Sequence, residues 1–171
     1  QAHTAAMVSI ADDLYGYSFG DGRAVRLTNT PGSEELASFS PDGKVVAFVR
    51  ANNLYVSDAA TGRETALTSD GSAKILNGKL DWVYEEEIYG RGKPRAYWWS
   101  PDSSRLAFLR IDDTPVKSYP VVDHIPYEQK VEQWDYPKAG DPNPFVNLLV
   151  ARVAGGSRTS VDTSSYPAAD H

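Results

Sequence analysis

The feature that most limits what this chain can fold into is an internal repeat. Residues 39–50 (FSPDGKVVAFVR) return as residues 99–110 (WSPDSSRLAFLR), 60 positions later. Ser-Pro-Asp-Gly is a tight-turn sequence, because Pro presets one backbone dihedral, Asp caps the turn and Gly accepts a positive φ. The apolar run after each turn is short and bounded, which predicts a strand. The repeat therefore predicts an all-β fold built from similar units.

A second repeat has a spacing of 40 positions. Residues 13–28 (DLYGYSFGDGRAVRLT) match residues 53–68 (NLYVSDAATGRETALT) at a Leu-Tyr pair, a Gly-Arg pair and a Leu-Thr pair, and a weaker copy begins at Asn147. Each copy predicts a strand, a glycine-containing turn and a second strand. Together the two repeats predict four short antiparallel strands over residues 36–68, which is one blade of a β-propeller.

The remaining repeat elements predict further, incomplete blades. Residues 7–28 resemble the later strands of a preceding blade, and residues 96–110 with 145–162 resemble a following one. Two to three four-stranded blades result, whereas closed propellers typically have four to eight. We therefore expect a partial β-propeller, with residues 1–171 as a fragment of a larger propeller domain.

Two inserts interrupt the blade pattern. Residues 71–94 carry a run of acidic side chains, and residues 111–144 are rich in proline and contain several aromatic residues. An insert as long as the second one is usually functional or disordered, and its aromatic side chains favour order and contact.

Composition excludes several classes of partner and site. The 171 residues are 41% hydrophobic and 23% charged, with a formal net charge of -6, which argues against nucleic acid or an anionic membrane as the main partner. No apolar run is long enough for a membrane span, and no signal peptide is recognisable. The chain has no cysteine, so disulfides and thiolate metal sites are excluded.

The acidic run is the strongest candidate for a functional site. Residues 81–89 (DWVYEEEIY) set adjacent carboxylates among large apolar and aromatic side chains. Asp81 is a good N-cap and Gly90 a good helix stop, so a short helical insert of about two turns is expected. Glu86 and Glu87 would then lie in its last turn, where the helix dipole disfavours negative charge. Two alternatives stay open: a solvated capped helix, or a site for a metal, an Arg or Lys side chain, or an ammonium ligand.

A metal or cofactor is not expected. No EF-hand-like spacing of oxygen ligands occurs, and the acidic pairs at 12–13 and 112–113 are candidates only if the fold brings them to the glutamates. The three histidines are interpreted as surface residues: His3, His124 and His171.

Several motifs together resemble one enzyme family. Residues 81–87 (DWVYEEE), 98–102 (WWSPD), 112–116 (DDTPV) and 136–140 (YPKAG) occur in the order seen in the β-propeller domain of the dipeptidyl peptidase IV family, within the prolyl oligopeptidase group of serine peptidases. The resemblance is good over residues 36–153 and generic at the N-terminal end.

The resemblance implies a fold, an activity and site residues. Family members have an eight-bladed propeller beside an α/β-hydrolase domain, and they release N-terminal Xaa-Pro or Xaa-Ala dipeptides. It implies that Glu86 and Glu87 bind the free N-terminal ammonium of a peptide substrate, with Glu85 in a structural role. Trp82, Tyr84 and Trp98 are expected to support the helix. The resemblance also implies an extracytoplasmic location, such as the periplasm or a secreted form, and leaves a homodimer open.

The catalytic residues of such an enzyme are expected outside this chain. No Gly-x-Ser-x-Gly occurs, nor the helix–strand alternation of a hydrolase domain. The family's arginine that holds the substrate carbonyl would fall near Ala5, where no arginine stands. The alternative to a peptidase is a propeller without catalytic activity that serves as a scaffold for protein–protein interaction.

Overall fold

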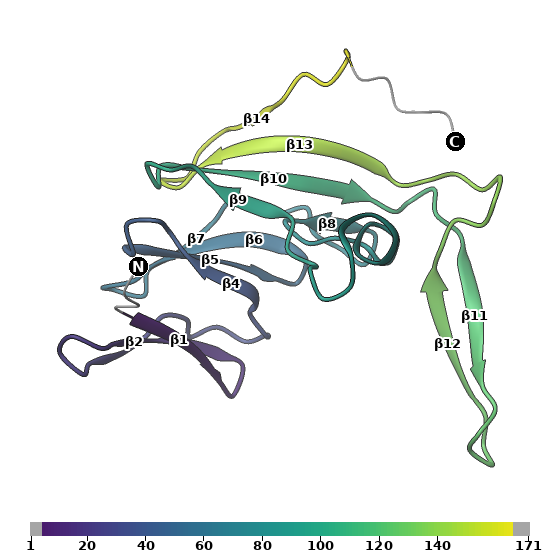
Figure 1. Ribbon diagram of the computed structural model, residues 1–171, viewed down its shortest axis with the longest axis horizontal. Helices are drawn as coiled ribbons and strands as arrows, with labels where there is room; N and C mark the ends of the chain where they lie inside the picture. Colours follow the sequence, from purple (N-terminus) through teal and green to yellow (C-terminus); the bar gives the residue numbers. More distant parts are fainter. Residues whose placement is uncertain (1–4, 166–171) are drawn as a thin grey trace.

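A computed structural model describes residues 5–165, which form antiparallel sheets and one short helical segment. Three sheets lie next to one another and a two-stranded hairpin projects away from them (Figure 1). The first sheet has the order β1-β2-β3, with β1 at Ala5–Ile10, β2 at Asp13–Ser18 and β3 at Ala24–Arg26. The prediction of an all-β chain is confirmed.

The second sheet has four strands in sequence order, and it lies between the first and the third (Figure 1). Its strands are β4 at Glu35–Phe39, β5 at Val45–Arg50, β6 at Asn53–Asp58 and β7 at Glu64–Ala66. Each strand is antiparallel to the next, as the two overlapping repeats predicted for this part of the chain. A register shift interrupts the pairing of β4 with β5.

The third sheet has the order β14-β13-β10-β8, and β9 also pairs with β10. Its strands are β8 at Ile75–Asn77, β9 at Tyr97–Trp99, β10 at Arg105–Asp112, β13 at Phe145–Arg152 and β14 at Arg158–Ser160. The proline-rich residues between β10 and β13 form the hairpin of β11 (Ser118–Asp123) and β12 (Lys130–Asp135). β8 lies within residues 71–94, so part of that stretch belongs to the sheet.

Both repeats correspond to recurring hydrogen bonds. In the Ser-Pro-Asp turns, the Ser40 hydroxyl donates to the Asp42 carboxylate at 2.7 Å, and the Ser100 hydroxyl donates to Asp102 at 2.5 Å. In the other repeat, the Thr28 hydroxyl accepts the Leu14 N–H at 2.8 Å, and Thr68 accepts the Leu54 N–H at 2.9 Å. These bonds join residues within one unit, which is why the sequence pattern reveals them.

The sheets are held together by buried apolar side chains and by a few polar contacts between strands of different sheets. The largest cluster combines residues of the second and third sheets, including Phe108, Leu106 and Val49, each at most 1% exposed. Tyr97, also buried there, donates its hydroxyl to the Ala47 carbonyl at 3.0 Å. Ser57 on β6 likewise donates to the Leu27 carbonyl at 2.6 Å and so joins the second sheet to the first.

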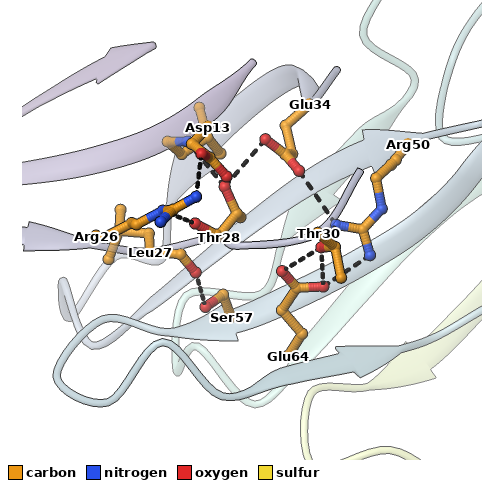
Figure 2. Close-up of polar contacts among 10 residues, drawn as sticks. Asp13, Arg26, Leu27, Thr28, Thr30, Glu34, Arg50, Ser57 and Glu64 are labelled. Atoms are coloured by element: carbon orange, nitrogen blue, oxygen red, sulfur yellow. Dashed lines mark hydrogen bonds and ion pairs between the residues drawn. The ribbon is translucent and has the colours of Figure 1, made fainter. Parts of the chain in front are cut away.

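A buried charge network crosses from the first sheet to the second (Figure 2). Arg50, at the end of β5, pairs with Glu34 at 3.1 Å and with Glu64 at 2.7 Å, and its guanidinium lies 4.4 Å from the centre of the Tyr55 ring. Glu34 also accepts the Thr28 hydroxyl at 3.0 Å. Since the Glu34 side chain is 0% exposed and that of Arg50 is 11% exposed, each charge depends on the other for stabilisation.

Candidate functional site

The glutamate-bearing segment leaves one strand and returns to it. β8 and β9 both pair with the same edge of β10. Between them, the Gly78 N–H donates to the Leu109 carbonyl and the Leu109 N–H donates to the Ala96 carbonyl, both at 2.9 Å. β8 and β9 are therefore two halves of one split strand, and residues 79–95 form an excursion from it.

The base of this excursion is closed by backbone hydrogen bonds. The Ala96 N–H donates to the Gly78 carbonyl at 2.9 Å, and the Leu80 N–H donates to the Pro94 carbonyl at 2.8 Å. Gly78 has φ +74°, and a Cβ there would lie 3.2 Å from the Leu54 side chain, so the exit point requires glycine. A closed base fixes where the tip of the excursion lies relative to the sheet.

Asp81 organises the start of the helical segment. Its carboxylate accepts the Tyr84 N–H at 3.0 Å, and its carbonyl accepts the Glu85 N–H at 3.1 Å. Residues 82–83 are α-helical, and the chain then widens into the π-helix η1 at Tyr84–Tyr89. The pKa of Asp81 is raised because the residue is only 7% exposed. The capping role expected for Asp81 is present, although the helix differs in type from an α-helix.

Glu86 and Glu87 lie among the last four residues of the helical segment 82–89, as expected, but η1 itself is so short that its first and last turns overlap. η1 begins at Tyr84, so both residues, together with Glu85, occupy its first turn. The N-terminal end of a helix favours negative charge. In so short a helix the dipole does not decide whether a cation is expected beside Glu86 and Glu87, so the contacts of the two side chains must decide it.

The three glutamates have three different environments. Glu85 accepts the backbone N–H of Gly92 at 3.0 Å, and Glu86 forms an ion pair with Arg91. The Glu86 side chain is 20% exposed and that of Arg91 is 83% exposed. Glu87 is exposed, and its side chain has no hydrogen bond or ion pair with any residue of the range 5–165. Arg91 was not singled out from the sequence, although its position between two glycines was a signal that the chain turns back there.

The aromatic residues expected to support this segment lie in different places. Tyr84 is half-buried and packs on a cluster that includes Leu80 and Ile111. Trp82 is 39% exposed and stacks edge-on against Tyr136, with ring centres 5.1 Å apart. Trp98, on β9, lines a groove beside the excursion. Tyr84 therefore connects η1 to the third sheet, while Trp82 connects it to the end of the hairpin.

The groove beside the excursion has a volume of about 440 Å³. Basic and apolar side chains line it, and the lining includes Trp98, Lys93 and Arg95 together with Leu36 of β4. Tyr89 brings the end of η1 to this groove, whereas Glu86 and Glu87 are not among its lining residues. The groove thus lies between the excursion and the second sheet.

A buried carboxylate cluster at the base of the hairpin was not recognised as a unit in the sequence. Asp113 is 5% exposed, and its Oδ1 atom has no hydrogen-bond partner among residues 5–165. Burial, and then the nearby charges of Asp81 and Asp135, raise its pKa to about 7 against the opposing charge of Lys74. Lys74 itself pairs with Asp135 at 2.8 Å. The residues come from separate segments, so spacing along the chain contains no signal for the cluster.

This cluster predicts a pH-dependent stability. A carboxyl group whose pKa rises from 3.8 unfolded to about 7 folded stabilises the fold only while protonated, so the free energy of unfolding should fall as pH rises between these values. Between pH 5 and pH 8 we expect a loss of about 2–3 kcal/mol from this residue, at about 1.4 kcal/mol per pKa unit.

Urea denaturation of the wild type and Asp113→Asn across this pH range measures the effect. In Asp113→Asn the free energy of unfolding should not show this fall with rising pH. At pH 8 the variant should therefore gain stability relative to the wild type. Asp112→Asn is a matched control, because the neighbouring carboxyl has a lowered pKa. Equal slopes in the wild type and Asp113→Asn would contradict the expectation.

The other candidate residues lie away from the glutamates or have partners. No group of three or more His, Cys, Asp or Glu side chains in residues 5–165 is arranged to hold a metal ion. Asp13 pairs with Arg26. His124 is exposed just after β11, while His3 and His171 lie outside the described residues. Within the described part of the chain, no helix has the length and hydropathy required to cross a membrane.

Comparison with known proteins places the chain in a family. The profile described as "Dipeptidyl peptidase IV (DPP IV) N-terminal region" matches residues 4–171. A probable dipeptidyl-aminopeptidase B of Emericella nidulans is 40% identical over 147 residues, which are 79% of this chain and 16% of the relative. The dipeptidyl aminopeptidase B of Saccharomyces cerevisiae is 39% identical over 127 residues, covering 71% of this chain and 15% of the relative.

A solved structure gives the same assignment. The crystal structure of Porphyromonas gingivalis dipeptidyl peptidase 4 superposes with a TM-score of 0.76 and 34% identity, covering 91% of this chain and 23% of that one. The chain thus spans only about a sixth of the first of these curated relatives, 16% of its length. Both the sequence and the fold show that this chain belongs to the dipeptidyl peptidase IV N-terminal region family.

Proposed function

We propose that this chain is the substrate-recognition part of a serine exopeptidase similar to dipeptidyl peptidase IV. In this proposal Glu86 and Glu87 bind the free N-terminal ammonium of a peptide, and the enzyme releases Xaa-Pro or Xaa-Ala dipeptides. The α/β-hydrolase domain of the same protein supplies the serine nucleophile and its partners, because this chain contains no Gly-x-Ser-x-Gly. An extracytoplasmic location and a homodimer belong to the same proposal.

The observation that carries the proposal is the set of contacts that the two adjacent carboxylates, Glu86 and Glu87, make. Glu86 already binds a cation, the Arg91 guanidinium, and Glu87 is exposed beside it without a side-chain partner among residues 5–165. Both stand on an excursion whose base is closed and whose start is capped. A pair of carboxylates held in this way suits an ammonium group, which offers three donors and one positive charge.

The arrangement also fits a partial propeller. We interpret the three sheets as neighbouring blades, of which the second has all four of its strands and the third has a split first strand that bears the helical insert. The first strand of a blade lies next to the central channel, so the glutamates would stand where a hydrolase domain closes one end of the propeller. A carboxylate pair in that position measures the distance from the peptide's N-terminus to the scissile bond, which is catalysis by positioning.

A panel of chromogenic substrates tests the proposal in the full-length enzyme. We expect cleavage of Xaa-Pro substrates with a free N-terminus, and a loss of at least about a hundredfold in kcat/KM when the same N-terminus is acetylated, which corresponds to about 2.7 kcal/mol. A substrate with one additional N-terminal residue should also be poor, because its ammonium places the wrong bond at the nucleophile.

Two outcomes would contradict the proposal in different ways. Equal cleavage of the free and acetylated substrates would exclude ammonium recognition while leaving a peptidase. Absence of hydrolysis of every substrate by well-folded protein would favour the alternative, a propeller scaffold without catalytic activity.

A further inference from the structure

Arg91 stands where a bound cation would stand in the proposed site. Its guanidinium pairs with the Glu86 carboxylate, and the charge of Glu87 also acts on it. The pKa of Arg91 is raised, first by the Glu86 hydrogen bond and charge and to a smaller extent by Glu87. One positive side chain therefore neutralises part of the negative charge of the carboxylate pair that the proposed function assigns to a substrate.

The backbone around Arg91 directs it to this position. Arg91 lies between Gly90, with φ +91°, and Gly92, with φ +75°. A Cβ atom at either glycine would have no neighbouring atom within 4 Å, so the turn is open to solvent. Glu85 accepts the Gly92 N–H at 3.0 Å and so fixes the turn from the side of η1. Glu85 thus helps to place Arg91 against Glu86.

The pair is built so that it can separate. The Arg91 side chain is 83% exposed, so it can leave Glu86 and remain hydrated, whereas the Glu86 side chain is only 20% exposed and stays with η1. An ion pair with an exposed partner contributes little to stability, so such a contact is easily exchanged for another. A lysine or arginine that was needed to hold the segment in place would be expected to be packed, and Arg91 is not.

We propose that Arg91 is a displaceable counter-ion of the ammonium site: it pairs with Glu86 beside Glu87 in the free protein, and the substrate's N-terminal ammonium exchanges with it. This rests on the proposed function of the two glutamates. Binding then replaces one cation with another, so Arg91 competes with the substrate and raises KM without entering the chemical step.

Kinetics of the full-length enzyme on a free-amine Xaa-Pro chromogenic substrate test the exchange. Arg91→Ala should lower KM about twofold to fivefold, the range expected from an exposed ion pair, with kcat within about twofold of the wild type. Arg91→Lys keeps the charge and should keep the wild-type KM. Arg63→Ala removes the same side chain from the turn between β6 and β7 and should leave KM unchanged.

Salt gives a readout that a structural role would not produce. At about 1 M NaCl the screening length is about 3 Å, so the KM values of the wild type and Arg91→Ala should converge. The inference is overturned if KM in Arg91→Ala is unchanged or higher, if the Lys variant behaves like the Ala variant, or if the KM difference persists at high salt.

The same series separates this inference from the proposed function. If Glu86→Gln and Glu87→Gln lose activity while Arg91→Ala has the wild-type KM, the ammonium site stands and the counter-ion role is wrong. If the Gln variants keep wild-type kinetics, the ammonium site is wrong and the exchange on it is overturned as well.

Discussion

Glu86→Gln and Glu87→Gln are each expected to lower kcat/KM of the full-length enzyme on a free-amine Xaa-Pro substrate by roughly 30-fold to several thousandfold. In the proposed complex the substrate and the hydrolase domain cover the two carboxylates. Removing one partner of a charge pair buried in this way costs about 2–5 kcal/mol, where about 1.4 kcal/mol corresponds to a factor of ten in rate. Gln keeps the size of Glu and an oxygen acceptor, so the loss reports the charge. Steady-state kinetics with free and acetylated substrates provide the measurement.

Two further substitutions make the result specific to this pair. Glu85→Gln should have a smaller effect, because an amide oxygen can still accept the Gly92 N–H. Asp21→Asn removes the same charge from an exposed turn of the first sheet and should have wild-type kinetics. Wild-type kcat/KM in both Glu86→Gln and Glu87→Gln would show that these residues do not bind a substrate ammonium.

Arg50→Met is expected to lower the free energy of unfolding by about 3–5 kcal/mol, the cost of breaking a buried ion pair by removing one partner. Glu34 is 0% exposed at its side chain, and after the substitution it would keep only the Thr28 hydroxyl as a partner within the network of Figure 2. The Met side chain preserves most of the packing on Tyr55. Urea denaturation followed by tryptophan fluorescence measures the change.

A variant that removes all three charges shows whether the single variant loses stability because a buried charge is left unpaired or because packing is lost. Arg50→Met combined with Glu34→Gln and Glu64→Gln should recover part of the stability lost in the single variant, because no unpaired ion remains buried. Substitutions of residues in contact are not additive, so the comparison is between the single and the triple variant. Equal stability of these two variants would mean that the charges themselves contribute little.

The fold was predictable where its determinants are local. The Ser-Pro-Asp turns close through hydrogen bonds between residues two apart, and the four strands β4 to β7 follow one another with short connections, so both leave a visible pattern. The split strand was not predictable, because β8 and β9 each have three residues and are strands only by pairing with β10. Nothing in residues 71–94 indicates that register.

The candidate site divides in the same way. The run of Glu85, Glu86 and Glu87, the cap at Asp81 and the stop at Gly90 were visible as residues, since capping and charge act over one or two helical turns. The π-helical form of the segment was not visible in the sequence, because the width of the helix depends on packing against the third sheet.

By itself the sequence determined the chemistry available to this protein: repeated antiparallel strands, three adjacent carboxylates and no catalytic nucleophile motif. Only the tertiary structure decided how that chemistry is arranged. It joined Asp113 to the charges of Asp81 and Asp135, joined Glu34 to Arg50, and gave the three glutamates different partners. The physical reason is that burial and charge interactions depend on distances in space, and these residues come together only when separate strands pack.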